Sequence, residues 1–299
     1  MAKSIKKFFQ LSNYWYNALL ILKKHNSRIN KFTSSVSPDE IKNLNDISFE
    51  VFDIDSGKYL EWVDKYYPQL PPELHEPKFK KLVEFYTSFH LLNPQSEDVF
   101  LDAAGGIHSY LNRLECKKRY MQDMRISDEL KNHLGSTIEY IDSNAAEIPL
   151  PDSGVDKISV HHSIEHFQQD SDTQFVREVQ RMLSIGGKCC IGPIFLNQTY
   201  IEMTGTFNFS MKFDDESKRV IDITSIFPGG ETSGNYARIY DLKSFKRRII
   251  DHIDADKYSS TIYEIRMDGQ SVPDFSLKCH RDTAHVESPY RVLLIERVK

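Results

Sequence analysis

The sequence predicts an α/β fold, built on a doubly wound, mostly parallel sheet with a helical segment before it and an insertion after its fifth strand. Between Asp98 and Phe195, short apolar runs alternate with amphipathic runs, a pattern typical of a parallel sheet with helices on both faces. The 299 residues are 40% hydrophobic and 27% charged, which is ordinary for a globular protein with a sizeable core. The alternation stops over residues 196–240 and then resumes; connections of that length inside an α/β domain are usually functional or mobile.

We divide the chain into an N-terminal helical segment that covers the fold, residues 1–95, and an α/β domain, residues 96–299. The first 38 residues carry no acid, and apolar side chains recur in them at roughly helical spacing, which predicts a basic amphipathic helix. Such a helix either docks on its own domain or on a second subunit, or lies through residues 1–33 on an anionic membrane or a lipid-linked substrate. Residues 34–75 look irregular, and Pro77 is expected to begin a further helix.

Within the α/β domain, apolar runs predict strands, and runs with a period near 3.6 residues predict helices. The expected strands are residues 98–103, 118–123, 137–141, 155–162 and 187–195, followed after the insertion by 257–267 and 290–298. The expected helices are residues 109–117, 126–134, 172–183 and 242–253.

Charge and cysteine content limit the classes of partner. The formal net charge of −5 argues against a nucleic-acid partner, because proteins that bind nucleic acids usually carry a strongly basic face. Four cysteines in a chain of this length do not resemble a disulfide framework and fit a reducing cytoplasm. No apolar run reaches the ~18 residues that a membrane span needs. We therefore expect a cytoplasmic protein, with peripheral membrane contact, if any, through residues 1–33; the oligomeric state stays open.

The loop after the first strand of the α/β domain is a candidate ligand site. The run "VFLDAAGG" ends in Asp102 and passes through Gly105 and Gly106. Small residues there let backbone N–H groups approach a ligand, although a tight turn without a ligand would look the same. The next strand closes on Asp123, at roughly the 20-residue separation where an acid hydrogen-bonds the hydroxyls of a ribose. Together these two signals indicate a nucleotide-like cofactor.

Five segments then carry a family resemblance. "VFLDAAGG", "YMQD", "NAAEIPLPDSGVDKI", "SIEHF" and "QRMLSIGGK" follow one another between residues 98 and 195. In order and spacing they resemble the class I S-adenosylmethionine-dependent methyltransferases, particularly the small-molecule branch. The resemblance implies a Rossmann-like fold, an enzyme that transfers a methyl group, and S-adenosylmethionine as cofactor. It argues against a nicotinamide enzyme, whose fingerprint would need glycines that are missing here.

The resemblance also implies the residues of the cofactor site. Asp102, Ala104, Gly105 and Gly106 would line the methionine end, Asp123 would bind the ribose, Asn144 and Ala145 would lie beside the adenine, and His161 would lie beside the sulfonium. Ala104 and His108 stand where the family has glycines. A catalytically degenerate module that binds the cofactor for interaction or regulation is therefore the alternative function.

The segment "VHHSIEH" supplies the candidate catalytic groups, His161 and His162. An oxygen acceptor must lose a proton as the new bond forms, and a histidine suits that task. Alternation along an extended segment sends the two side chains in opposite directions, so that at most one faces the acceptor; we expect His161 to be nearer the transferring methyl. Glu165 and His166 belong to the Glu-His pair of the family, for which a structural role is expected. The predicted reaction is O-methylation of a small molecule or of a sugar of a surface glycan.

Two further segments contain residue types that bind substrates or metals, but their patterns are less specific. Arg238 would hold a phosphate or carboxylate of the substrate, or is an ordinary solvated arginine. The segment 279–287 contains histidine, cysteine and glutamate, but its spacing fits no tetrahedral zinc pattern. We therefore predict no metal site.

Overall fold

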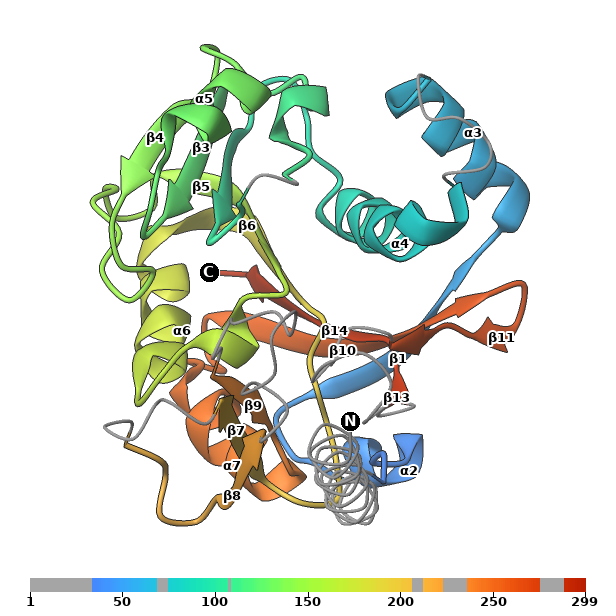
Figure 1. Cartoon of the computed structure of the whole chain (residues 1–299), viewed down its shortest axis with the longest axis vertical. Helices are drawn as coiled ribbons and strands as arrows, with labels where there is room; N and C mark the ends of the chain where they lie inside the picture. The colour runs from blue at the N-terminus through green and yellow to red at the C-terminus, as the bar shows by residue number, and fades with distance from the viewer. Residues whose placement is uncertain (1–33, 69–74, 107–108, 206–211, 223–235, 275–287) are drawn as a thin grey trace, which may run out of the picture.

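The computed structural model describes residues 34–68, 75–106, 109–205, 212–222, 236–274 and 288–299 (Figure 1). Its centre is one sheet whose main path runs β1-β10-β14-β6-β5-β2-β3-β4, with the short strand β11 (Gln270–Ser271) paired to β10. Strands β4, β3, β2, β5 and β6 are parallel, whereas β14 is antiparallel to both of its neighbours. The strands of the path are β1 (Ser48–Ile54), β2 (Val99–Ala103), β3 (Lys118–Asp123), β4 (Glu139–Asp142), β5 (Val155–His161), β6 (Leu183–Gly192), β10 (Tyr258–Met267) and β14 (Arg291–Arg297).

The strand order reverses between β2 and β5. From β2 the chain proceeds outward through β3 and β4, and it then returns to place β5 and β6 on the other side of β2. In doubly wound sheets, ligands bind at the carboxyl ends of the strands beside such a reversal. The predicted fold class is confirmed, and the carboxyl ends of β2 and β5 are the place to look for a site.

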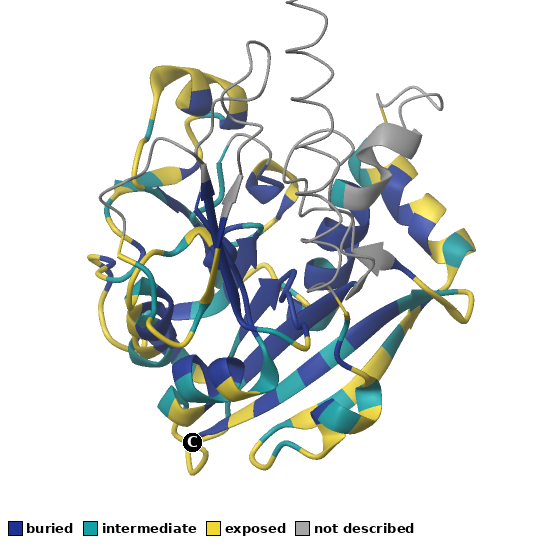
Figure 2. Cartoon of the chain, turned by 60° about the horizontal axis from the view of Figure 1, so that its bottom comes forward, coloured by how far each residue is buried: buried dark blue, intermediate teal, exposed yellow. Residues whose placement is uncertain are grey.

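Helices cover both faces of the sheet. Helices α3 (Ser56–Tyr66), α4 (His75–Leu92) and α5 (Asp128–Leu134) contribute to one buried apolar cluster, and α6 (Ser171–Met182) and α7 (Leu242–Arg248) contribute to the other. Figure 2 shows the central strands as mostly buried between these layers. The strongly amphipathic run of α6 places Phe175, Val176 and Val179 in its cluster, as its sequence predicts.

The expectation that residues 34–75 are irregular is wrong. They form α2 (Pro38–Lys42), β1 and α3, and α4 begins at His75, before Pro77. Ser37 and Glu40 form a capping box on α2, and Asp55 caps α3. Strand β1 pairs in parallel with β10, so the N-terminal segment adds an edge strand to the sheet of the α/β domain.

The helix expected over residues 109–117 is also wrong. Within the described part of this range there is only one 3-10 turn, η2 (Leu111–Arg113). The guanidinium of Arg119 donates to the carbonyl oxygens of Leu111 and Leu114, at 3.2 and 2.9 Å. These carbonyls therefore bond a side chain of β3 instead of the amides four residues on that an α-helix requires.

The described parts of the insertion at residues 196–240 form a second, three-stranded sheet in the order β8-β7-β9, beside α7 (Figure 1). Its strands are β7 (Ile201–Gly205), β8 (Lys218–Asp222) and β9 (Ala237–Ile239). The amphipathic helix predicted near the N-terminus lies outside the described residues. Among the helices that are described, none is long and apolar enough to cross a membrane.

Candidate active site at the carboxyl ends of β2 and β5

The loop after β2 turns sharply around a buried acid. The carboxylate of Asp102 accepts hydrogen bonds from the hydroxyls of Ser159, at 2.7 Å, and Ser109, at 2.5 Å. A Cβ atom on Gly105 would lie 2.4 Å from Asp102 Oδ2, so no side chain fits at that position. Gly106 has a φ of +69°, and a Cβ atom there would meet nothing within 4 Å. The loop therefore packs tightly against Asp102 on one side and is open at Gly106. His108 lies outside the described residues.

Two neighbours that the sequence did not single out hold this loop. The backbone N–H of Ala104, whose φ is +50°, donates to Gln122 Oε1 at 3.1 Å. The hydroxyl of Ser163 donates to the carbonyl oxygen of Ala104 at 2.8 Å. Gln122 is buried, and its amide also donates to the carbonyl oxygen of Ser143. The loop is thus bonded to β3 on one side and to the end of β5 on the other.

The predicted ribose and adenine residues lie at the next two strand ends. Asp123 closes β3 half-buried, and its Oδ1 accepts the backbone N–H of Arg125 at 3.0 Å. Asn144 is exposed just beyond β4, where its Oδ1 accepts the backbone N–H of Ala146 at 3.0 Å, and Ala145 is buried. The backbone of Ser143 bonds that of Asp123. The two segments therefore adjoin along one edge of the sheet, as their strand positions predict.

His161, the last residue of β5, lies inside the protein. It is 5% exposed, and its Nε2 is 2.9 Å from the hydroxyl of Ser88 on α4. Its Nδ1 is 3.7 Å from Asp102 Oδ1. Burial lowers the pKa of His161, although Asp102 opposes the shift. The ring is consequently neutral at physiological pH and packs between α4 and the end of β2.

His162 has a different environment. Its side chain is 23% exposed, and its Nε2 contacts the carboxylate of Glu84, which also lies on α4. Its Nδ1 is 3.5 Å from Glu165 Oε1. Burial lowers the pKa of His162, but hydrogen bonds and the charges of Glu165 and Glu84 outweigh it and raise the pKa to about 9. The expected alternation does not extend to this residue, because its φ of +51° turns the chain, and both histidines reach α4.

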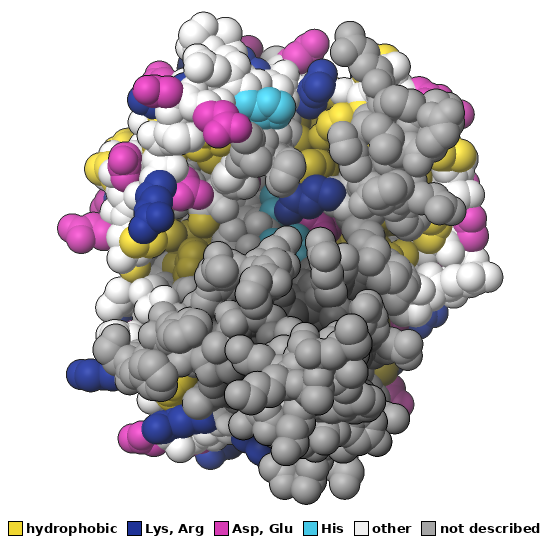
Figure 3. All heavy atoms as spheres, in the orientation of Figure 1, with side chains coloured by type: hydrophobic (Ala, Val, Ile, Leu, Met, Phe, Trp, Pro, Cys, Tyr) yellow, Lys and Arg dark blue, Asp and Glu magenta, His cyan; other side chains and the backbone are white. Residues whose placement is uncertain are grey.

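The acid beside His162 is charged despite its burial. Glu84 is 6% exposed, and its Oε2 is 3.0 Å from the ammonium of Lys81. Burial raises the pKa of Glu84, but the hydrogen bond and charge of His162 and the charge of Lys81 outweigh it, so that the net shift is downward. Histidine, basic and acidic side chains lie together in a hollow at the middle of the face drawn in Figure 3.

Arg238, a candidate for binding a substrate anion, is neither solvated nor open to a ligand. It is 1% exposed, and its guanidinium lies 2.5 Å from Asp172 Oδ2 and 2.9 Å from Glu202 Oε1. Arg248 pairs with the same aspartate at 2.7 Å. Both expectations for Arg238 are therefore wrong, because this buried ion network between β7, β9, α6 and α7 satisfies the charge.

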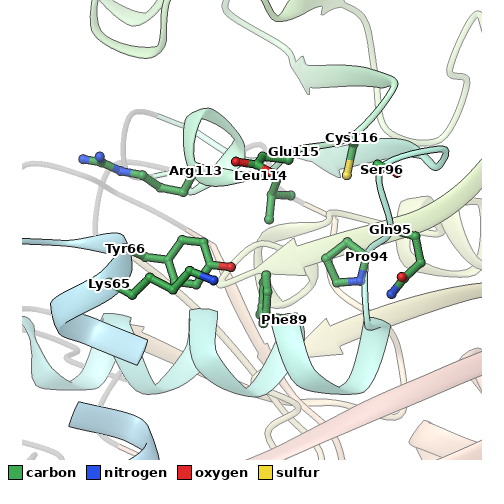
Figure 4. Close-up of a pocket in the computed structure, with 10 residues that line it drawn as sticks. All are labelled: Lys65, Tyr66, Phe89, Pro94, Gln95, Ser96, Arg113, Leu114, Glu115 and Cys116. Carbon is green, nitrogen blue, oxygen red and sulfur yellow. The ribbon is translucent and has the colours of Figure 1, made fainter. Parts of the chain in front are cut away.

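A cavity of about 210 Å³ lies at the other end of the strands (Figure 4). Its wall combines aromatic, charged and small side chains from α3, from α4 and from the segments before β2 and β3: Lys65, Tyr66, Phe89, Pro94, Gln95, Ser96, Arg113, Leu114, Glu115 and Cys116. In the part of the chain that the structure describes, no three or more His, Cys, Asp or Glu side chains are grouped to hold a metal ion. The segment 279–287 lies outside that part.

Comparison with known proteins gives one family. A family described as a methyltransferase domain matches residues 107–191. No curated protein matches the chain. The solved structures that resemble it include three bacterial proteins. The 1,6-didemethyltoxoflavin-N1-methyltransferase of Burkholderia thailandensis, with bound 1,6-didemethyltoxoflavin and S-adenosylhomocysteine, is 12% identical over 89% of this chain and 92% of that chain, with a TM-score of 0.44. The YcgJ protein of Bacillus subtilis is 12% identical over 73% and 99%, with a TM-score of 0.44, and an S-adenosylmethionine-dependent methyltransferase of Mesorhizobium loti is 11% identical over 72% and 97%, with a TM-score of 0.43.

The matched residues run from the loop after β2 to β6, within a sheet whose order reverses between β2 and β5. Residues 107–191 of the chain thus match a methyltransferase domain, which supports an enzyme that uses S-adenosylmethionine. This match supports the enzyme class and the cofactor predicted from the sequence.

Proposed function

We propose that the protein transfers a methyl group from S-adenosylmethionine to an oxygen atom of a small molecule or of a sugar of a surface glycan. When bound, the cofactor supplies an electrophilic methyl group on a sulfonium. The observation that carries the choice of oxygen is the environment of His162, a partly exposed imidazole held beside two carboxylates where the strand order reverses. An oxygen nucleophile needs such a base, because its proton must leave as the O–C bond forms.

The residues at the strand ends fit the cofactor. Gly106 is open to a ligand, and Asp123 keeps acceptor capacity after bonding Arg125, because a carboxylate offers about four lone-pair sites. We assign the methionine end to the loop at Asp102, Ala104, Gly105 and Gly106, the ribose to Asp123, the adenine to Asn144 and Ala145, and a supporting place beneath the loop to His161.

Of the two predicted catalytic histidines, His162 is the better candidate for the base. Nε2 of His161 is bonded to Ser88 and its ring is almost fully buried, so an acceptor cannot reach it without displacing α4. The Nδ1 atom of His162 has only a 3.5 Å approach to Glu165, which is longer than a good hydrogen bond. Once the ring has lost its own proton, which its pKa of about 9 places at alkaline pH, an acceptor hydroxyl that binds there can give its proton to Nδ1.

The insertion is proposed to shape the acceptor side of this site. The ring of His166, four residues after His162, contacts the carbonyl oxygen of Tyr236 through Nδ1 at 2.6 Å. Tyr236 directly precedes β9. The insertion is therefore bonded to the turn that carries Glu165, whereas the cofactor residues lie on the other strand ends. A lipid-linked glycan would suit the basic segment before residue 34.

Calorimetry tests the cofactor site. S-adenosylhomocysteine should bind with micromolar affinity, about −8 kcal/mol. Asp123→Ala should weaken binding by about 1.5–3 kcal/mol, since a charge-assisted hydrogen bond to the ribose is lost. Asp142→Ala, at the exposed end of the neighbouring strand β4, is the matched control and should leave the affinity unchanged. Equal losses in both variants would remove Asp123 from the site.

Transfer of a labelled methyl group tests the reaction. The assay offers the labelled cofactor with a panel of phenols, sugars and amines, and mass spectrometry locates the added methyl. We expect methyl ethers, and His162→Gln should slow their formation by about 10²–10⁴ while binding S-adenosylhomocysteine normally. Methylated amines alone would contradict the choice of oxygen. Cofactor binding with no turnover on any acceptor would favour the regulatory alternative.

A further inference from the structure

Helix α4 brings a buried acid to the catalytic strand end from outside the matched methyltransferase residues. Glu84 lies on α4, more than twenty residues before the matched range of 107–191 begins. Its carboxylate contacts Nε2 of His162 through Oε1, and its Oε2 is 3.0 Å from Lys81. A carboxylate this deeply buried is costly unless it is paired. The pairing with His162 therefore supports both the charge of Glu84 and the orientation of the ring.

The same face of α4 holds both histidines. Glu84 and Ser88 are four residues apart, so they lie on one face of the helix. Glu84 contacts His162, and Ser88 contacts His161 at 2.9 Å. The helix thus fixes the end of β5 at two successive residues, and only the contact between Glu84 and His162 involves a charge.

The contact with Glu84 decides which ring nitrogen of His162 is available. In the neutral imidazole one nitrogen donates and the other accepts. Nε2 contacts Glu84 directly, whereas Nδ1 is 3.5 Å from Glu165, so when the ring loses its proton as the pH rises through about 9 the hydrogen stays on Nε2 and the lone pair is left on Nδ1. Nδ1 faces Glu165 Oε1 across 3.5 Å. The second oxygen of Glu165, Oε2, is buried and has no hydrogen-bond partner among the described residues, so this side of the ring has acceptor capacity for a further donor.

We propose that Glu84 is a positioning residue for methyl transfer, which holds the His162 ring with Nδ1 toward the acceptor, so that helix α4 completes the catalytic site. The catalytic part of this proposal rests on the proposed function. The acceptor O–H gives its proton to Nδ1 as the O–CH₃ bond forms and the S–CH₃ bond breaks, and the electron pair of that bond stays on sulfur. Positive charge passes from the sulfonium to the imidazolium, beside which Glu84 supplies the opposite charge.

The test compares Glu84→Gln, which removes the charge, with Glu84→Asp, which keeps it and retracts it by one methylene. Glu61→Gln, at an exposed position of the neighbouring helix α3, is the control. The first readout needs no acceptor: ring ¹⁵N shifts of His162, assigned by their loss in His162→Gln, are followed against pH. In Glu84→Gln the imidazolium should lose its proton at least tenfold more readily, and the neutral ring should no longer favour the Nε2–H tautomer.

The second readout is the pH profile of labelled-methyl transfer. Glu84→Gln should lower the plateau rate at least tenfold and move the limb that reports His162 to lower pH, while the affinity for S-adenosylhomocysteine stays within twofold. Glu84→Asp should recover part of the rate. A purely structural role would lower the plateau without moving the limb.

The two readouts separate this proposal from the proposed function. An unchanged His162 titration in folded Glu84→Gln overturns the contact itself. A changed titration with unchanged turnover overturns the positioning role. If the unaltered protein forms no methyl ethers, the proposed function and the catalytic part fall together, whereas the titration result stands. If circular dichroism shows that Glu84→Gln does not fold, the His162 titration is measured in Glu84→Asp instead. A shift in the same direction but of smaller size is then expected.

Discussion

Folding should be coupled to pH through His162. Its pKa is about 9 in the folded protein, against an ordinary 6.5. Because the folded state binds the proton more tightly, the contribution of this residue to stability is fully present below about pH 6.5 and is lost as the pH rises through about 9. The perturbation is His162→Gln, which removes the titrating group but keeps a hydrogen-bond donor.

The magnitude follows from the two pKa values. A difference of roughly 2.5 units at 1.36 kcal/mol per unit gives about 3 kcal/mol. The 23% exposure of the side chain admits some solvent screening, so about 3 kcal/mol is an upper value. In the wild type the pKa of Glu84 is lowered and its titration lies below this window, whereas in His162→Gln this acid loses the hydrogen bond and charge of His162 that oppose its burial, so its pKa rises.

The assay is urea unfolding of the wild type and His162→Gln at several pH values between about 6 and 10. Apart from His162 and its partner Glu84, the titrating groups are shared, so the difference between the two free energies of unfolding is used. The wild type should exceed the variant by about 3 kcal/mol more at the acid end than at the alkaline end. A difference that is flat within the error of the extrapolation, or one that grows with pH, would refute the reasoning.

Two further predictions concern packing. Gly105→Ala would place a Cβ atom 2.4 Å from Asp102 Oδ2; thermal melts should show a loss of about 1–3 kcal/mol, and calorimetry should show weaker binding of S-adenosylhomocysteine, whereas unchanged melting would mean that the loop can move aside. Asp172→Asn removes one partner of the buried ion network around Arg238 and should cost about 3–5 kcal/mol in urea unfolding. Asp152→Asn, which removes a surface partner of Arg181, should cost about 0–1 kcal/mol, and equal losses in the two variants would contradict the assignment of burial as the cause.

Much of the fold could be predicted because periodicity is local. The strand predicted over residues 118–123 has the bounds that the structure shows, and Gly135 ends α5, as expected of a helix stop residue. Strand β1 was missed because its residues alternate weakly: most of "SFEVFDI" is exposed or half-buried at the sheet edge. The prediction of a helix after the cofactor loop was wrong for a non-local reason: Arg119 of the following strand donates hydrogen bonds to backbone carbonyl oxygens of this segment.

The candidate site likewise contains residues that the sequence predicted and residues that it did not. Asp102 and Asp123 could be predicted because they end parallel strands, and the carboxyl ends of parallel strands lie at the same edge of the sheet, where ligands bind. Glu84 could not be found, because it lies 78 residues from His162 and nothing in its own helix marks it as different from a surface acid. The departure of His162 from strand alternation was equally hidden, since a positive φ at a residue other than glycine is uncommon and has no sequence signal here.

The buried network limits how an acceptor reaches His162. Arg238 donates to the carbonyl oxygen of Gln169 at 2.8 Å as well as to Glu202 and Asp172, so β7 and β9 are bonded to the segment that follows the Glu-His turn. Moving these two strands away from α6 would leave buried charges unpaired, at a cost of several kcal/mol. That cost would be paid in every turnover if the insertion opened as a unit. We therefore expect β7 and β9 to stay on the core throughout the reaction, and an acceptor to reach His162 without their displacement.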